Sequence, residues 1–583
     1  MQKSLLLILT LLLTSLPQPS FGQAPQTLAP VTGAPTTLGP LVGTDGNLLD
    51  GVSANPALSA DGNVIIFAAR ATNLLDAGSA DPRFDFWQIY AYDRAQDAMT
   101  RVSSGPGGQP GNGSSGGSPP VVSADGNLVA FASRADNLVF GDSNDAVDIF
   151  VYDRAAAQMA RVSVTSAGGQ GTRDSYLPAI AADGNVVAFV SQARNLVADD
   201  TNSAADIFVH DRRTGQTQRV SVSSTGAQAN GTSGISAPAL SADGRYVAFA
   251  SLANNLVPGD TNNAADVFIH DRQTGHTQRV SVRSAGAQAD GASTAPTLSG
   301  DGRYVAFLSS APNLASGDPA AQTHVYLHDR QTRTTVRIST THDGAPANGQ
   351  SFAPALSADG RYVAFAALAD NLVPNDSNLA VDIFLHDGLS GQIERVSLTA
   401  AGGQSDGLAW RPALGGYGRY VAFEANASNL TAVNLAPEDA PTRPAIYLRD
   451  RGAQSTGAYT LTGQILGPDD EPVSGLAVQV GLRFPRQTQT DGGGRFGVDN
   501  LPAGDYAVAI DAPNYLLDPP FPQTVTVGET IGETGGETQE TTLAIRAYPC
   551  VGPGELNLCA LRAGDILLAL TPDGADWPQV GGT

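Results

Sequence analysis

Residues 237–282 read APALSADGRYVAFASLANNLVPGDTNNAADVFIHDRQTGHTQRVSV, and degraded copies of this stretch recur along most of the chain. The clearest marker of the register is a turn residue before a glycine, an aspartate in six copies and a tyrosine in the seventh. These markers are Asp61, Asp125, Asp183, Asp243, Asp301, Asp359 and Tyr417. Their separation of 58 to 64 residues indicates a repeat architecture.

Each copy contains four short runs with strand character. In the best copy the runs are 238–241, 245–251, 266–270 and 277–282. The first two flank Asp243-Gly244, and Asp-Gly is a strong hairpin signal because a type I′ turn needs positive φ at both central positions. The segment YVAFA at 246–250 is apolar at successive positions, which is typical of a sheet covered on both faces. Each copy therefore predicts one four-stranded propeller blade.

The two ends of the repeat region are complementary. The seventh copy stops after a third strand at 445–451, whereas Leu38–Gly51 aligns with the end of a copy. We expect Leu38–Val42 to supply the missing outer strand and to close the ring by pairing the two ends. The predicted fold is all-β: a seven-bladed β-propeller over 38–451, followed by a small β-sandwich domain.

Copies four to six read PALSADGRYVAFAS, PTLSGDGRYVAFLS and PALSADGRYVAFAA. They resemble the TolB-type propeller repeat, a relative of the WD-type blade, with the core P-x-x-S-x-D-G-x-x-[IVL]-x-F and a following [VI]-[FY]-x-x-D strand. The sequence departs from that pattern at Tyr417, at the third strand of copy five, and at the insertion Asp81–Gln88 in copy one. The resemblance implies a fold far more strongly than a function.

A second module is predicted over 458–546, where short strands alternate with turn signals. It resembles the carboxypeptidase regulatory-like, or transthyretin-like, β-sandwich. The residues that carry this resemblance are Gly463, Pro472, Gly475, Thr490, Asp491, Arg495, Phe496 and 501–506.

The first 22 residues predict a secretory signal peptide, with Lys3 before the apolar run Leu5–Leu13 and small residues at the exit. An extended leader follows at 23–37. The apolar run is too short to span a bilayer, and no later stretch is long enough either. We therefore expect an exported protein, periplasmic or extracellular, that is not membrane-spanning.

The tail at 547–583 contains both cysteines of the chain, Cys550 and Cys559, which an export compartment would allow to form one small disulfide loop. The segment LRAGDILL at 561–568 resembles the opening of NlpC-type amidases or peptidases. The histidine and the later cysteine of those enzymes are missing. A plain tail and a truncated further domain both remain open.

The formal net charge of −23 argues against nucleic acid as a partner, because phosphate binding needs a basic surface. In a four-stranded meander the second-to-third and blade-to-blade loops share one face. These loops are the long ones here, for example 252–265, and long loops on rigid scaffolds commonly bind ligands. We expect a monomer that engages a protein or glycan ligand on this face.

On the same face Asp-[Ser/Thr]-Asn-x-x-x-Asp recurs in four copies. Three oxygen-bearing side chains in seven residues suit a hard cation, so calcium is the one candidate cofactor, and none is certain. The alternative is that the same residues make Asx turns that shape the loop. The candidates are Asp142, Asn144, Asp148, Asp200, Asn202, Asp206, Asp260, Asn262, Asp266, Asp376, Asn378 and Asp382.

Signals for catalysis are weak. Four histidines, His210, His270, His328 and His386, share one register beside a turn, and in a ring they would lie far apart. Residues 113–117 satisfy G-x-S-x-G without the flanking strand and helix of a nucleophile elbow. We assign no catalytic residue and leave open whether the chain is an enzyme.

Three functions are compatible with these patterns. The first is a non-catalytic binding or scaffold protein that uses the long-loop face. The second is the targeting portion of a cell-wall or peptide hydrolase whose NlpC-type domain is truncated. The third is a calcium-dependent adhesive module.

Overall fold

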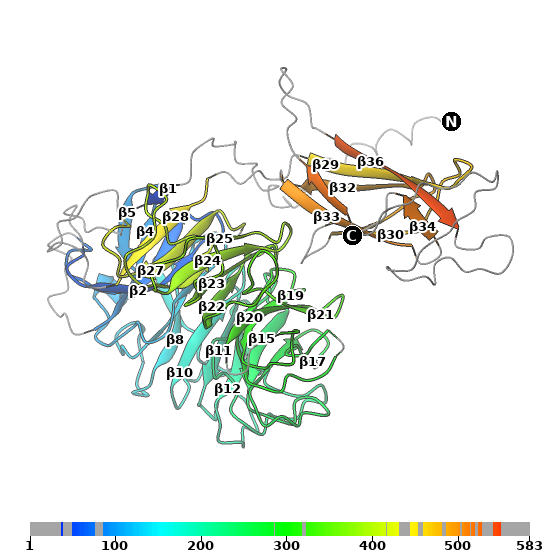
Figure 1. Cartoon of the computed structure of the whole chain (residues 1–583). Coiled ribbons are helices and arrows are strands. Elements are labelled where there is room, and N and C mark those ends of the chain that lie inside the picture. The colour runs from blue at the N-terminus through cyan, green and yellow to red at the C-terminus, as the bar shows by residue number, and fades with distance from the viewer. Residues whose placement is uncertain are drawn as a thin grey trace, which may run out of the picture.

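The computed structural model describes residues 36–38, 49–75, 86–284, 286–317, 322–415, 417–430, 444–452, 459–480, 486–501, 504–512, 515–518, 523–527 and 540–549. The predicted signal peptide, nearly all of the leader and residues 550–583 of the predicted tail, with Cys550 and Cys559, lie outside these ranges. Among the described residues there is no α-helix, and the one helical element is the 3-10 turn η1 (Pro106–Gly108). None of them forms a helix that could cross a membrane. The chain is all-β, as predicted (Figure 1).

Seven four-stranded sheets are found in the described part of the repeat region. Blade 1 contains β2 (Val52–Leu58), β3 (Val64–Arg70), β4 (Gln88–Asp93) and β5 (Ala98–Arg101). Blade 2 contains β6 (Val121–Val122), β7 (Leu128–Ser133), β8 (Asp148–Asp153) and β9 (Gln158–Arg161). Blade 3 contains β10 (Ser175–Ile180), β11 (Val186–Ser191), β12 (Asp206–Asp211) and β13 (Gln216–Arg219). Blade 4 contains β14 (Ala239–Leu240), β15 (Tyr246–Ser251), β16 (Asp266–Asp271) and β17 (His276–Arg279).

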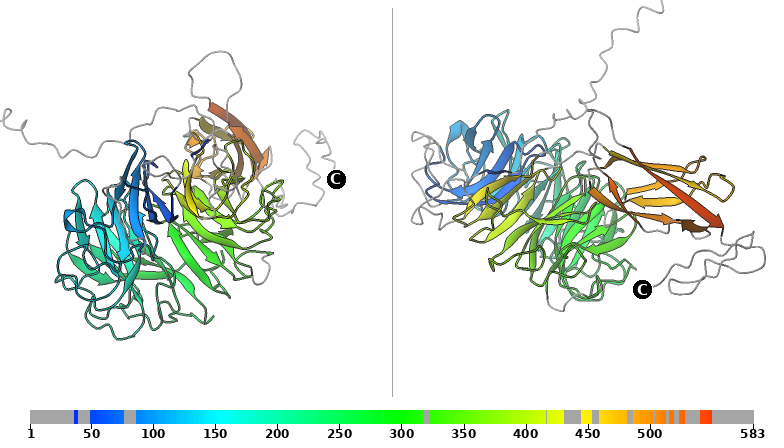
Figure 2. Two further views of the ribbon diagram at one scale, coloured as in Figure 1. Left: turned by 90° about the vertical axis from the view of Figure 1, so that its left-hand side faces the viewer. Right: turned by 45° about the horizontal axis from the view of Figure 1, so that its top comes forward.

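The remaining blades follow the same order. Blade 5 contains β18 (Ser293–Leu298), β19 (Tyr304–Ser309), β20 (His324–Asp329) and β21 (Thr334–Arg337). Blade 6 contains β22 (Ser351–Leu356), β23 (Tyr362–Ala367), β24 (Asp382–Asp387) and β25 (Ile393–Arg395). Blade 7 contains β26 (Ala409–Leu414), β27 (Tyr420–Ala425), β28 (Ala445–Asp450) and β1 (Thr36–Leu38). The blades follow one another around a ring (Figure 2).

The ring closes through its first and last strands. β1 pairs antiparallel with β28, with Thr36 opposite Asp450, so the start of the chain completes the last blade. We expected this strand at Leu38–Val42, and it overlaps that segment only at Leu38. The strand lies earlier because each outer strand begins opposite the aspartate that ends the third strand, as at Asp271 and His276 in blade 4.

Each blade is held to its neighbours by aromatic and aliphatic side chains from its two central strands. An aromatic residue of the second strand stacks on one of the third, with ring centroids 5.9–6.1 Å apart. In blade 4 this pair is Phe249 and Phe268, both fully buried. These strands face neighbouring sheets on both sides, which is why their apolar residues are continuous. Packing of this kind recurs in all seven sheets.

The hairpin turns differ from the predicted type I′ geometry. In blade 1 the N–H of Gly62 donates to the oxygen of Ser59 (3.0 Å), so the central residues are Ala60 and Asp61. Gly62 alone has positive φ, at 70°. Asp61 instead accepts from Ser59 Oγ and from the N–H of Asn63 (2.5 and 2.9 Å). The turn thus uses the carboxylate of the aspartate as a hydrogen-bond acceptor and requires the glycine for its positive φ.

The second domain is a sandwich of two four-stranded sheets, in the orders β32-β29-β36-β34 and β31-β30-β33-β35. Its strands are β29 (Tyr459–Leu466), β30 (Ala477–Val480), β31 (Arg486–Gln489), β32 (Arg495–Leu501), β33 (Gly504–Asp511), β34 (Tyr515–Asp518), β35 (Gln523–Val527) and β36 (Glu540–Pro549). Leu389, in the β24–β25 turn of blade 6, belongs to the same buried apolar cluster as Leu461, Ile465 and Val478. The sandwich therefore packs on the propeller at that turn (Figures 1 and 2).

Candidate functional site

The propeller presents two different faces. On the long-loop face lie the loops between second and third strands and those between blades, such as 252–265 and 280–292 around blade 4. On the short-loop face lie the tight turns, including the one that carries Leu389. The first strands of neighbouring blades contact each other around the ring axis. Their starting residues therefore surround the axis on the long-loop face.

The Asp/Asn motif forms a compact ion-pair network, which we call the loop clamp. In blade 4 it comprises Asp260, Asn262, Asp266, Arg279 and Ser281. The fully buried Asp266 accepts from Ser281 Oγ (2.5 Å) and Asn262 Nδ2 (3.1 Å). The guanidinium Nη1 of Arg279 lies 3.4 Å from a carboxylate oxygen of both Asp260 and Asp266. The clamp therefore ties the long loop to the outer strand of its blade.

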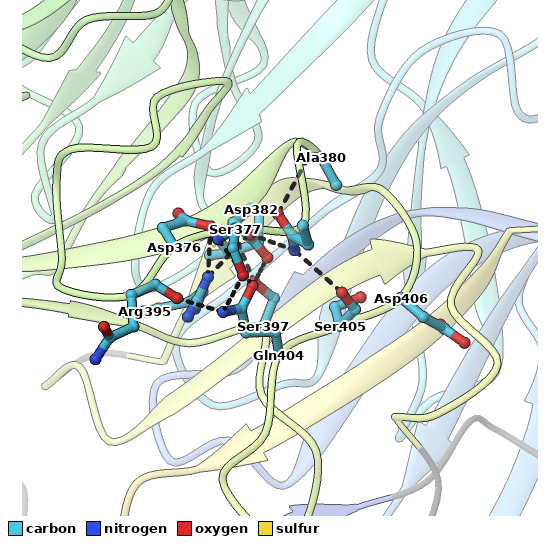
Figure 3. Close-up of polar contacts among 12 residues, drawn as sticks. Asp376, Ser377, Ala380, Asp382, Arg395, Ser397, Gln404, Ser405 and Asp406 are labelled. Carbon is cyan, nitrogen blue, oxygen red and sulfur yellow. Dashed lines mark hydrogen bonds and ion pairs between the residues drawn. The ribbon is translucent and has the colours of Figure 1, made fainter.

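The same clamp recurs in blades 2, 3 and 6, where Arg161, Arg219 and Arg395 take the place of Arg279. Figure 3 shows the blade 6 copy, in which Arg395 Nη1 lies 2.8 Å from Asp376 and 3.4 Å from Asp382. The structure thus brings together all three predicted residues of each motif. The arginine is not among the predicted site residues, although it stands at one register, thirteen residues after the second aspartate, in all four copies.

The geometry favours the Asx-turn alternative at these loops. Asn262 Oδ1 accepts from the N–H of Ala264 (3.0 Å), which is an Asx turn, and so is not directed at the carboxylates. Gln288 Nε2 donates to Asp260 and Asp266 (2.9 and 3.2 Å), and Arg279 supplies the positive charge. Among the described residues no group of three or more His, Cys, Asp or Glu side chains could hold a metal ion. Calcium binding here stays a prediction.

Burial dominates the electrostatics of the clamp. It raises the pKa of Asp148, Asp206 and Asp266, while the hydrogen bonds and the neighbouring arginine act in the opposite direction. A buried carboxylate of this kind depends on its arginine, because an unpaired buried charge is costly.

Three of the four histidines at one register, His210, His270 and His328, take part in contacts between neighbouring blades. In blade 4 the hydroxyl of Thr277 donates to the oxygen of Val222 in the preceding blade (2.5 Å), so it accepts from His270 Nδ1 (2.9 Å). The same relay joins His210 to Thr217 and His328 to Thr335. Burial lowers the pKa of His270 and His328 to about 4. These side chains stabilise contacts between blades and lie in separate blades.

We expect the stability of the propeller to fall as the pH drops from 7 to 4. An unfolded imidazole binds a proton near pH 6.5, whereas His270 and His328 stay neutral in the fold until about pH 4. Between these values the unfolded state binds more protons, which costs up to about 3 kcal/mol for each histidine. The measurement is urea unfolding across this pH range.

The matched variant for that prediction is His270→Tyr, because blades 1 and 2 carry Tyr92 and Tyr152 at this register. Carboxylates contribute equally to the pH dependence of stability in both proteins, so the difference between the two pH profiles reports the contribution of His270. We expect a shallower fall in the variant, and an unchanged pH profile would contradict the assignment.

Residues 113–117 do not form a nucleophile elbow. The central residue, Ser115, is buried, and its hydroxyl lies 2.8 Å from that of Ser133 in the adjacent strand. Blades 3, 4 and 5 contain the same serine pair at 2.9 Å. The motif is therefore part of the repeat.

A buried glutamate joins the first and last blades. Glu424 in β27 stands where most other blades have alanine, and only 2% of it is exposed. It accepts from the N–H of Asn55 in blade 1 (2.6 Å), from Trp410 Nε1 (2.5 Å) and from Arg411 Nη1 (3.3 Å). Glu424 is not among the predicted site residues, although YVAFE in place of YVAFA distinguishes its copy in the sequence.

Exposed apolar side chains gather on the long-loop face. Eight large apolar residues are exposed in the described part of the chain, and only Tyr417 lies on the short-loop face. The other seven lie in the long loops or next to the strand ends beside them. They are Phe140, Ile235, Leu252, Phe352, Leu368, Leu379 and Leu408. Interaction surfaces expose apolar side chains, so the long-loop face is the better candidate for one.

Comparisons with known proteins give one family match and several distant structural neighbours. Residues 460–533 match the family model of the carboxypeptidase regulatory-like domain. No curated protein matches the sequence significantly. Similar solved structures include an oligogalacturonate lyase in complex with manganese, with 14% identity, a TM-score of 0.42, and coverage of 72% of this chain and 96% of that one. A putative TolB from Agrobacterium tumefaciens has 15% identity, a TM-score of 0.31, and coverage of 49% and 80%.

A third similar structure is the β-propeller domain of the Trilobed protease from Pyrococcus furiosus, with 10% identity, a TM-score of 0.40, and coverage of 64% and 89%. The propeller assignment rests on the seven sheets of this chain. Its second module is similar, over residues 460–533, to the carboxypeptidase regulatory-like domain.

Proposed function

We propose that this chain is an exported, non-catalytic binding protein, periplasmic or extracellular, whose long-loop face engages a protein or glycan ligand. The observation that carries the proposal is the placement of the exposed apolar residues, seven of eight on that face. Ring closure through β1 and β28 makes the propeller a rigid support for these loops.

The position of the second domain also supports ligand binding on the long-loop face. The sandwich packs on the propeller at Leu389, which lies on the short-loop face. The histidines and the Ser115 hydroxyl are buried in contacts within and between blades, so they serve the fold.

Site-specific photo-crosslinking tests the proposal. A photoreactive residue at Leu379, which is 82% exposed, should give discrete adducts in cells that make the full chain. The matched control is Tyr417, which is 64% exposed on the opposite face, and it should give none. A glycan array probed with the purified chain covers carbohydrate ligands. Equal labelling from both positions, or no adduct from Leu379 together with a blank array, would refute the proposed function.

A further inference from the structure

One blade departs from the repeat at the long-loop face. Six blades place a glycine two residues before the serine or alanine that lies opposite the end of the second strand, and blade 3 places Arg173 there. The glycines are Gly51, Gly113, Gly231, Gly291, Gly349 and Gly407. The position is crowded, since a Cβ at Gly349 would lie 1.9 Å from the backbone oxygen of Leu368. Arg173 therefore stands at a position where the other blades leave little room for a side chain.

A second departure adjoins the first. In five other blades, a side chain from the residue before this glycine bonds to a residue that follows the second strand, as in Asn230 Nδ2 to Asn254 Oδ1 (2.7 Å). The other pairs are Asp50–Thr72, Asn112–Asp136, Asn348–Asp370 and Asp406–Ser428. In blade 3 these positions hold Thr172 and Arg194, and Thr172 bonds to Asn195 Oδ1 instead (3.1 Å). Blade 3 thus lacks this side-chain contact between the two loops and carries a second arginine, Arg194, at one of its positions.

Both arginines are exposed, and the backbone segments that carry them lie side by side. The N–H of Gln192 donates to the oxygen of Asp174 (3.0 Å), which brings the chain around Arg173 beside that around Arg194. Among the described residues neither arginine forms an ion pair or a side-chain hydrogen bond, whereas many other arginines of the propeller are engaged, such as Arg245 with Asp271. In a chain of net charge −23, these two guanidinium groups are thus accessible to an acidic ligand.

We propose that Arg173 and Arg194 receive carboxylate groups of a partner protein, and this inference rests on the proposed function. Guanidinium groups bind carboxylates with two parallel hydrogen bonds, so a pair of them suits an acidic segment. The leucines of blades 4, 6 and 7, Leu252, Leu368 and Leu408, lie on the same face. They favour a protein over a glycan, because aliphatic side chains gain most from packing against other apolar side chains.

The test uses the full chain and the double variant Arg173→Gly/Arg194→Asn, which gives blade 3 the residues of blade 4 and so preserves the fold. The probe is a fluorescent twelve-residue peptide of alternating glutamate and leucine pairs. We expect salt-sensitive binding to the wild type and a loss of about tenfold or more in the variant. Arg213→Gln, on the short-loop face, is the matched control and should bind like the wild type.

Three outcomes would overturn the inference: no binding of the peptide, equal binding by the double variant, or equal binding of the same peptide with glutamine in place of glutamate. Arginine-dependent binding of alginate without binding of the peptide would also overturn it, in favour of an acidic glycan. If Leu379 still crosslinks while the double variant binds normally, this inference fails and the proposed function stands.

Discussion

Replacing Asp266 with alanine will lower the free energy of unfolding by about 3–5 kcal/mol, because it leaves Arg279 buried without its full counter-charge. Asp266 has no exposed surface and accepts hydrogen bonds from Ser281, Asn262 and Gln288. Urea and thermal unfolding of the full chain measure the change.

The double variant Asp266→Ala/Arg279→Ala is the control for that prediction. Removing both charges should cost clearly less than the sum of the two single changes, and additive effects would show that the pair does not act as a unit.

Adding calcium to the wild type distinguishes an ion-pair network from a calcium site. With Arg279 supplying the positive charge, we expect millimolar calcium to leave the wild-type midpoint unchanged, and a calcium-dependent rise that Asp266→Ala abolishes would instead establish the calcium site.

Replacing Glu424 with alanine will loosen the closure of the ring, although alanine is the residue that most other blades have there. The change leaves the buried N–H of Asn55 and the part-buried Nε1–H of Trp410 without their acceptor, at about 1–3 kcal/mol for the buried donor. Hydrogen exchange should therefore increase in β2 and β26 and remain unchanged in blade 4.

The control is Glu394→Ala, which removes a half-exposed partner of Arg451 on blade 6. The Glu394 carboxylate is half-exposed and Arg451 keeps its hydrogen bond to the oxygen of Gly418, so the exchange pattern of this variant should match the wild type. A uniform increase in exchange around the ring of the Glu424 variant would contradict a local role at the closure.

The blade pattern could be predicted because its causes are local. The run YVAFA in 246–250 is apolar at successive positions, and the stacked pair Phe249 and Phe268 comes from the two strands that this run and VFI define. The closing strand was placed a few residues late, because its register depends on Asp450, more than 400 positions along the sequence. The predicted type I′ turn was wrong. The Asp-Gly pair alone does not show where the turn begins, and in blade 1 it begins at Ser59, whose oxygen accepts from the N–H of Gly62.

The loop residues were found, but their partners were not. Asp260, Asn262 and Asp266 are close in sequence, whereas the arginine and glutamine that contact them come from the next strand and the next loop. Glu424 and Arg173 are visible as departures from the repeat only when all copies are compared at one register. Their environments depend on neighbouring blades.

The sequence by itself determined that this chain is a ring of four-strand repeats followed by a sandwich, because periodicity and apolar runs are properties of neighbouring residues. Only the tertiary structure decided that the Asp/Asn loops are closed by an arginine, that the histidines link blades, and that the exposed leucines and arginines share one face. These features depend on contacts between separate strands and blades, and such contacts exist only after the ring has closed.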